Sequence, residues 1–272
     1  MTPPGRRPPL SQHFLHDARA AARIAGALRA PPGARVLEIG PGEGALTRHL
    51  LDRGWRVTAV ELDRGLAGKL AERWGDRDGF EVVQGDALAF TLPPGSGPWW
   101  IIGNLPYAIT TPLLFRLLAE IRRAPIAEMV FMVQKEVADR LAAAPGTKAY
   151  GSLTVGVALV ADVEVLFEIG PGSFRPPPRV RSSVFRLVPH RRWPLEEARR
   201  ARLQVLVQRL FGQRRKQLQK ALRTLEPWRL DAATAARVGA RAGIDLSRRP
   251  ETLTAPEWLA LDAALEEEPG HA

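Results

Sequence analysis

One stretch of the chain joins an amide, a proline and an aromatic ring at the end of an expected strand. The strand is the apolar run 99–102, and it is followed by Gly103, Asn104, Leu105, Pro106 and Tyr107. Side chains that follow a strand in an open α/β sheet lie at the carboxyl edge, where such sheets hold their ligands. We therefore expect this corner to form the edge of an active site.

Methyl transfer to an exocyclic amino group of a base would use these residue types. The lone pair of such a nitrogen is delocalised into the ring, so it is a poor nucleophile until acceptors on both N–H bonds favour a pyramidal nitrogen. The side-chain oxygen of Asn104 offers one acceptor, and the backbone carbonyl of Leu105 or Pro106, held by the restricted proline backbone, offers the other. Tyr107 offers a flat face to an unstacked base, a contact worth roughly 1–3 kcal/mol. The alternative is an Asn-Pro turn with Tyr107 as a half-buried core residue.

Upstream strands are expected to end in a glycine loop and in acids. Gly40 and Gly42 follow the strand 35–39 in a tight turn that feeds a helix, where the backbone can approach a ligand closely. Glu61 ends the next strand and would accept hydrogen bonds from ribose hydroxyls. Asp86, after the third strand, would accept from an adenine amino group or cap a helix. The alternative for the first two features is a plain glycine turn and a surface acid.

The glycine loop alone does not separate two cofactors. Its spacing also fits the dinucleotide pattern, and Glu61 lies near the usual distance of the ribose-binding acid, so NAD and S-adenosylmethionine both remain possible. The Asn-Leu-Pro-Tyr corner favours S-adenosylmethionine, because a dehydrogenase gives no reason for it.

The residues named above are expected to be positioned by strands and helices that alternate along the chain. Strands are expected over 35–39, 56–61, 80–84, 99–102 and 129–133, with helices between them and one more over 134–144. This alternation predicts a parallel sheet covered on both faces, and two later strands around a proline-rich loop predict an antiparallel edge. We expect an α/β fold with a doubly wound, Rossmann-like sheet and a small helical C-terminal domain. The expected parts are a flexible basic tail over 1–10, a methyltransferase domain over 11–190 and an RNA-contacting helical domain over 191–272.

Composition narrows the class of protein. The 272 residues are 45% hydrophobic, which suits a globular chain, and the net charge of +10 favours a polyanionic partner, although an arginine-rich solvated surface would give the same balance. The chain has no cysteine, and its five histidines form no ligand-spaced cluster, so we expect no metal. No apolar run is long enough for a membrane span or a signal peptide. We expect a cytoplasmic monomer without a membrane partner.

Several stretches together closely resemble the KsgA (RsmA) family of ribosomal RNA adenine dimethyltransferases, from Gln12 to about Leu222. The likeness is carried by the combination, because no single stretch is specific. The matching stretches are 12–15 (QHFL), 37–42 (LEIGPG), 104–112, 134–138 (QKEVA), 150–151 (YG), 174–178 (FRPPP) and 211–222.

The resemblance implies transfer of methyl groups from S-adenosylmethionine to two adjacent adenines of small-subunit ribosomal RNA in pre-ribosomal particles. It assigns to the cofactor site Gln12, His13, Leu15, Gly40, Gly42, Glu61, Asp86 and Asn104. It also assigns residues to the substrate. Asn104 and Tyr107 would hold the target adenine, and Phe174 would lie on the other side of the base. The phosphates would be bound by Arg214, Arg215 and Lys216. The alternatives are a packed loop aromatic for Phe174 and a solvated helix face for the basic residues.

Three positions depart from the family pattern, and other functions remain open. Ser11 stands where the family usually has glycine, His13 where it often has Asn, and Arg181 where it often has an acid. One rival is an antibiotic-resistance methyltransferase acting on large-subunit RNA. A DNA adenine methyltransferase is a second, disfavoured because no target-recognition domain is evident. A rival of another class is an assembly factor that binds immature small subunits, with methylation secondary or lost.

Overall fold

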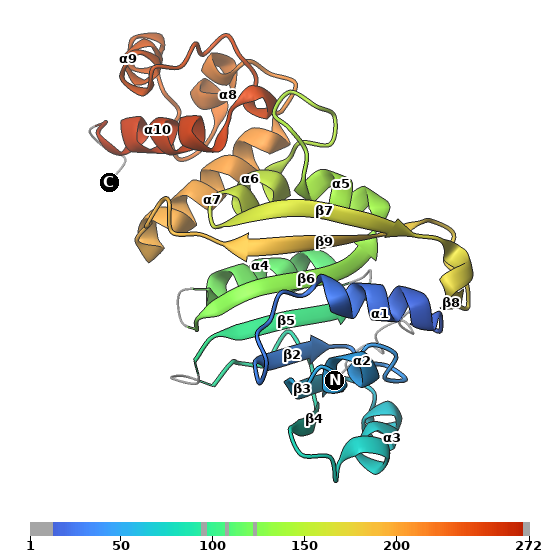
Figure 1. Ribbon diagram of the computed structural model, residues 1–272. Helices are drawn as coiled ribbons and strands as arrows, with labels where there is room; N and C mark the ends of the chain where they lie inside the picture. Colours follow the sequence, from blue (N-terminus) through green and yellow to red (C-terminus); the bar gives the residue numbers. More distant parts are fainter. Residues whose placement is uncertain (1–12, 94–96, 107–108, 122–123, 269–272) are drawn as a thin grey trace, which may run out of the picture. The chain divides into compact units, whose positions relative to one another are not determined.

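The computed structural model describes residues 13–93, 97–106, 109–121 and 124–268 (Figure 1). Contacts within the chain divide it into two compact units. The first contains Met1–Ala138 and Ala161–His190, and the second contains Asp139–Val160 and Arg191–Ala272. Residues 139–160 thus group with the C-terminal helices, although they lie within the range that the sequence assigned to the methyltransferase domain.

The first unit is built on a seven-stranded sheet in the order β4-β3-β2-β5-β6-β9-β7. Its parallel strands are β2 (Arg35–Ile39), β3 (Arg56–Glu61), β4 (Phe80–Gln84), β5 (Trp99–Asn104) and β6 (Ile126–Gln134). The antiparallel edge consists of β9 (Ser182–Pro189) and β7 (Ala161–Ile169). The predicted fold class, a mostly parallel doubly wound sheet with an antiparallel edge, is confirmed.

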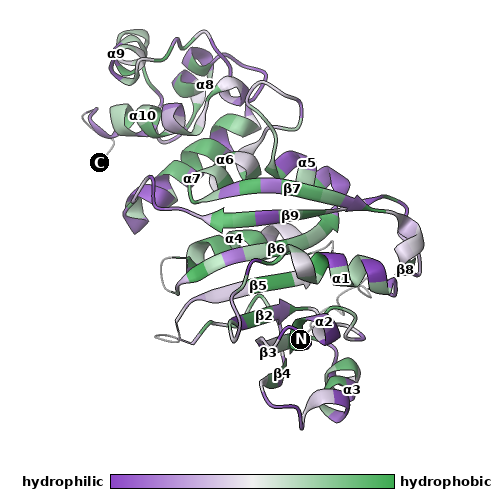
Figure 2. Ribbon diagram, viewed as in Figure 1, coloured by the Kyte–Doolittle hydropathy of each residue, from purple (hydrophilic) through white to green (hydrophobic). Residues whose placement is uncertain are grey.

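The central strands are nearly continuous apolar runs, as expected for a sheet covered on both faces. Ile101, Ile102 and the β6 residues Met129 to Val133 are fully buried, and Figure 2 shows β6 and β9 largely in the hydrophobic colour. The helices of this unit are α1 (Ala18–Ala27), α2 (Thr47–Leu51), α3 (Arg64–Trp74), α4 (Thr110–Glu120) and the start of α5 (Lys135–Leu141). The helix predicted over 134–144 is shorter at both ends, because β6 continues to Gln134 and α5 ends at Leu141.

A short second sheet connects the N-terminal segment to the proline-rich loop. Strand β1 (Phe14–Leu15) pairs antiparallel with β8 (Phe174–Arg175), which follows the 3-10 turn η1 (Pro171–Ser173). Asp17 caps α1 by accepting from the backbone N–H groups of Arg19 and Ala20, and it also accepts from the Ser173 hydroxyl at 2.9 Å. The segment before α1 is thus held against residues about 160 positions away in sequence.

A buried ion pair anchors the other end of α1 to the sheet. Arg186 on β9 lies 3.4 Å from the Glu128 carboxylate on β6, and both side chains are almost fully buried. Arg186 also donates to Glu164 and to the Ala27 carbonyl, each at 2.6 Å, while Glu128 accepts from the backbone N–H of Arg29 at 2.7 Å. With both ends of α1 fixed, the residues just before it have a defined position.

The second unit is helical. It contains the rest of α5, α6 (Ser152–Ala158), α7 (Glu197–Gly212), α8 (Leu218–Thr224), α9 (Ala232–Ala242), η2 (Pro250–Thr252) and α10 (Ala255–Glu266). Helix α7 buries the apolar stripe that its sequence predicts, namely Leu203, Leu206, Val207 and Leu210, and this stripe belongs to a core that includes the fully buried Trp258. Asp262 on α10 pairs with Arg199 and Arg202 of α7 at 2.9 Å each.

Candidate active site

The carboxyl ends of the central strands bring the predicted site residues to one edge. Strand register pairs Ile39 with both Val60 and Gly103, so Gly40, Glu61 and Asn104 come at the ends of three adjacent strands, β2, β3 and β5. The strands can approach closely here because residue 103 is glycine: a Cβ on it would lie 2.5 Å from the Ile39 carbonyl oxygen. These three predicted site residues therefore lie at one edge of the sheet.

The glycine loop after β2 uses a backbone that favours glycine. Gly40, Gly42 and Gly44 have φ values of +63°, +58° and +82°, in the left-handed region. The Gly42 N–H donates to the Glu61 carboxylate at 3.0 Å, and the Asp63 N–H donates to its other oxygen at 2.9 Å. Glu61 thus ties the loop to the end of β3, a role that the sequence did not predict, and each of its oxygens keeps a further lone pair for a ligand.

Asn104 is oriented by the N-terminal segment. Its side-chain nitrogen donates to the backbone oxygen of His13 at 3.2 Å. The His13 ring nitrogen Nδ1 in turn lies 2.7 Å from the Pro176 carbonyl oxygen of the proline-rich loop. His13, where the family often has Asn, therefore links the loop to Asn104 and shows one way in which this departure is accommodated.

The two candidate carbonyls near Asn104 differ in how they are used. The Pro106 oxygen accepts from the Ile109 N–H and from the Thr110 hydroxyl, both at 3.1 Å, in the first turn of α4. The Leu105 N–H donates to the Met132 oxygen at 3.0 Å, which fixes this peptide against β6. These contacts favour Leu105 over Pro106 as the carbonyl that faces a ligand. Tyr107 and Gln12 lie outside the described residues.

A small cavity opens at this edge and includes an acid that the sequence analysis did not assign to the site. It is lined by Phe14, Leu15, Gly40, Gly42 and Asn104 together with Glu38. Glu38 on β2 is fully buried, and neither carboxylate oxygen has a hydrogen-bond partner in the described part of the chain. Burial raises the pKa of Glu38 to about 8, with a smaller contribution from the charge of Glu61, while the nearby Thr47 hydroxyl and backbone N–H partly offset this rise. The sequence carried a signal for Glu38, namely an acid within the otherwise apolar end of the strand 35–39, since a buried acid is uncommon unless it has a function.

Asp86 and Phe174 both have structural contacts within the fold. Asp86 accepts from the Leu88 N–H at 2.9 Å, so it caps the turn after β4. Phe174 is 2% exposed and packs in the core with Leu15 and Ile24, which is the arrangement that the alternative interpretation describes. Contact of Asp86 with adenine and of Phe174 with a base stay predictions.

The third departure, Arg181, pairs with an acid of its own unit. Its Nε donates to the Glu168 carboxylate at 2.6 Å, and the Lys135 ammonium lies 3.3 Å from the other oxygen of the same group. The hydrogen bonds from Arg181 and Lys135 hold the pKa of Glu168 below its ordinary value. Two cations share one carboxylate here: Lys135 follows β6, Arg181 precedes β9, and Glu168 lies near the end of β7.

The three basic residues of the second unit are not equivalent. Arg214 donates to the Lys148 carbonyl at 3.4 Å and lies 3.6 Å from the Glu251 carboxylate, whereas Arg215 and Lys216 are exposed.

The described residues contain no cluster of side chains that could hold a metal ion, and none of their helices is long and apolar enough to cross a membrane.

Comparison with known proteins identifies the family. The family model described as ribosomal RNA adenine dimethylase matches residues 5–261. The chain belongs to this family. It is 42% identical over 261 residues to ribosomal RNA small subunit methyltransferase A of Pseudomonas fluorescens, covering 95% of this chain and 93% of that one. It is 43% identical to the protein of the same name in Thermosynechococcus vestitus, covering 93% and 94%.

Solved structures agree with the assignment of this chain to the dimethylase family. The crystal structure of the 23S rRNA methyltransferase ErmE aligns with a TM-score of 0.71 at 30% identity, covering 93% of this chain and all of that one. A dimethyladenosine transferase from Plasmodium falciparum aligns with a TM-score of 0.76 over 92% and 96% of the two chains, and at 24% identity this likeness supports the fold alone. The resemblance inferred from the sequence is confirmed.

Proposed function

We propose that this dimethylase transfers methyl groups from S-adenosylmethionine to the exocyclic amino nitrogens of two adjacent adenines in small-subunit ribosomal RNA. The observation that carries the proposal is the single edge at which Glu38, Glu61 and Asn104 meet. Family membership and relatives at 42–43% identity that are named for the small subunit support the choice of RNA. The likeness to the large-subunit enzyme is lower, at 30% identity.

The residues at this edge suit an amino-acid-bearing nucleoside. S-adenosylmethionine, when bound, supplies an activated methyl group on a sulfonium. The buried, unpartnered carboxylate of Glu38 would accept from the ammonium group, which compensates a charge that is otherwise costly to bury. The unused lone pairs of Glu61 would accept from the ribose hydroxyls, and Asp86 would accept from the adenine amino group. Gln12, His13, Leu15, Gly40 and Gly42 complete the proposed cofactor site.

The target amino group would be held by two acceptors. Asn104 Oδ1 takes one N–H and the Leu105 carbonyl takes the other, which favours the pyramidal nitrogen needed for attack on the methyl carbon. The alkylated nitrogen is acidic and loses its proton to water, so we propose no general base and no metal ion. Positioning of the two reacting atoms then supplies most of the rate. Tyr107 and Phe174 would flank the base.

The RNA would be held mainly through its phosphates. Arg215 and Lys216 are exposed, and Arg214 lies beside them, so this segment can supply several cationic contacts. We propose that residues 11–190 carry the methyltransferase function and that residues 191–272 contact RNA in pre-ribosomal particles, within a cytoplasmic monomer.

The proposal is tested by labelled methyl transfer to immature small subunits, mature small subunits, large-subunit RNA and duplex DNA, with mass spectrometry of the products. Dimethyladenosine formed only in small-subunit substrate is expected. Label in large-subunit RNA or in DNA would overturn the proposal. Restored subunit maturation by a Glu61→Ala protein that binds particles without methylating them would favour the assembly-factor alternative.

A further inference from the structure

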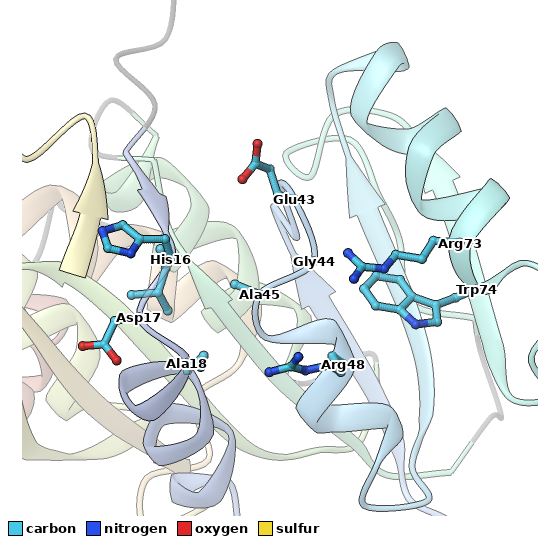
Figure 3. Close-up of a pocket in the computed structure, with 11 residues that line it drawn as sticks. His16, Asp17, Ala18, Glu43, Gly44, Ala45, Arg48, Arg73 and Trp74 are labelled. Carbon is cyan, nitrogen blue, oxygen red and sulfur yellow. The ribbon is translucent and has the colours of Figure 1, made fainter.

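A second cleft in the first unit lies beside the candidate active site and holds two arginine side chains. It has a volume of about 310 Å³ and lies between the start of α1, the glycine loop, α2 and the end of α3 (Figure 3). Its charged or aromatic lining residues are His16, Asp17, Glu43, Arg48, Arg73 and Trp74. It shares Leu15, Glu43 and Ala45 with the cavity at the Asn104 edge, so the two are neighbours.

The two guanidinium groups are oriented toward the cleft. Figure 3 shows the Arg48 side chain directed toward α1 and the Arg73 guanidinium directed toward the glycine loop at Gly44, while the carboxylates of Asp17 and Glu43 are directed away from both guanidinium groups. Arg48 lies 3.5 Å from the His49 ring, and Arg73 lies over the Trp74 ring at 4.8 Å from its centroid. Within the described ranges, neither arginine pairs with a carboxylate.

The acids at the rim do not neutralise this charge. Asp17 already accepts from two backbone N–H groups of α1 and from the Ser173 hydroxyl. The pKa of His49 is held below its ordinary value by burial and then by the positive charges of Arg48 and Arg53, as expected on an electropositive surface. Two cations thus line one cleft, and no carboxylate of the described residues pairs with either of them.

We propose that this cleft binds a phosphate group of the RNA chain whose adenine is presented to Asn104; the proposal rests on the proposed function. Planar guanidinium groups match the paired oxygens of a phosphate, and Arg48 on α2 and Arg73 on α3 line the same cleft. An RNA strand that places a base at the Asn104 edge must continue past the adjoining surface, and the cleft lies on that surface. The phosphate is therefore one that flanks the target base.

The contact is independent of base sequence. Trp74 is 9% exposed, and the loop backbone covers its ring, because a Cβ on Gly44 would lie 2.4 Å from it. The ring thus forms a wall and offers no face on which a base could stack. The cleft fixes the register of the RNA through charge and leaves the choice of base to the Asn104 edge.

The test measures binding of small-subunit RNA by the full-length protein over a range of salt concentrations. Arg48→Ala, Arg73→Ala and the double variant are compared with Arg56→Ala, which removes an exposed arginine at the opposite, amino-terminal end of β3. Each single cleft variant should make the negative slope of log K for RNA binding against log salt shallower by about one. The double variant should lower the affinity for RNA by about 10-fold or more. Arg56→Ala should leave both unchanged. The Arg48→Lys/Arg73→Lys protein should keep the slope, because it keeps both charges.

Two further measurements separate the possible outcomes. Affinity for S-adenosylmethionine and the midpoint of thermal unfolding should be unchanged in the double variant, and a weakened cofactor complex would assign the arginines to the cofactor instead. Titration with inorganic phosphate and with adenosine monophosphate tests a site for small anions. The proposal would be overturned if the double variant lost binding of phosphate and adenosine monophosphate but kept the RNA affinity and the salt slope of the unmodified protein. Absence of methyl transfer by the unmodified protein would refute the proposed function but leave the salt-slope result to decide the cleft.

Discussion

The side-chain nitrogen of Asn104 donates a hydrogen bond of 3.2 Å to the backbone oxygen of His13. Because the amide nitrogen is used in this way, the oxygen Oδ1 faces away from the His13 carbonyl and is the atom that we propose accepts from a substrate N–H. The last residue of β5 is thus oriented by a segment 91 positions earlier, which is itself held by α1 and by the proline-rich loop.

Replacing Asn104 by Ala should lower kcat by about 100-fold or more, because the amino group of adenine loses an acceptor and the reacting atoms lose their alignment. Affinity for S-adenosylmethionine should stay measurable, since the glycine loop and Glu61 are intact. Single-turnover methylation and calorimetric titration check the two statements. Asn104→Asp keeps an acceptor but places a carboxylate oxygen against the His13 carbonyl, so it should also be impaired. Unchanged turnover of Asn104→Ala would remove Asn104 from catalysis.

Glu61 is predicted to hold both the cofactor and its loop. Glu61→Ala removes acceptors for the Gly42 and Asp63 N–H groups as well as for the ribose, and each charged hydrogen bond is worth about 1.5–3 kcal/mol. Affinity for S-adenosylmethionine should therefore fall by about 10-fold or more, and Glu61→Gln should lose less because its amide oxygen still accepts. Calorimetric titration gives the affinities, and Glu81→Ala, an exposed acid on β4, is the matched control. Equal affinities for Glu61→Ala and Glu81→Ala would contradict the assignment.

Much of this arrangement is readable from the sequence because it depends on local patterns. The strands predicted over 35–39, 56–61 and 80–84 have the bounds of β2, β3 and β4, since apolar runs that end in glycine or an acid mark a buried strand and its edge. The pairing of β1 with β8 was not predicted, because two-residue strands carry no periodicity and their partners lie 160 positions apart. The ligand role that we propose for Glu38 was not predicted, because Glu38 lies within a run of apolar residues that is typical of a core strand.

Asp86 and Pro106 show a second limit of the sequence. Asp86 was expected to accept from adenine or to cap a helix, and Pro106 was one of two candidate carbonyls. In the structure Asp86 accepts from the Leu88 N–H, and the Pro106 carbonyl accepts from the Ile109 N–H and the Thr110 hydroxyl. Competition between a ligand and a nearby N–H group depends on turn geometry, which residue types alone do not determine.

The buried Glu38 should make stability depend on pH. Its pKa rises from an ordinary value of 4.5 to about 8 on folding, so between these values the folded state holds a proton that the unfolded state has lost. The contribution to the free energy of unfolding is fully present below about pH 4.5 and is lost as pH rises to about 8, with a slope of about 1.4 kcal/mol per pH unit. Glu38→Gln should therefore become more stable relative to the unmodified protein as pH rises through this window.

Denaturant unfolding of both proteins at a series of pH values measures this difference. Glu81→Gln, which neutralises an exposed acid of the same sheet, should run parallel to the unmodified protein. Parallel curves for Glu38→Gln as well would show that Glu38 is ionised in the unliganded fold. The ammonium group of bound S-adenosylmethionine would favour ionised Glu38, so in the unmodified protein cofactor affinity should rise with pH up to about 8.

The glycine loop offers a test of why glycine is required at residue 44. Gly44→Ala imposes a left-handed φ of +82° on alanine and places its Cβ 2.4 Å from the Trp74 ring. Gly54→Ala is the matched control, because Gly54 also has a left-handed φ, of +71°, but has nothing within 4 Å of its Cβ position. The control should lose about 1–2 kcal/mol of stability from the backbone alone. Gly44→Ala should lose a further 1–3 kcal/mol or so from the clash, and denaturant unfolding measures both. Equal losses would mean that α3 moves away from the loop without cost, and the Trp74 wall of the arginine cleft would then not be rigid.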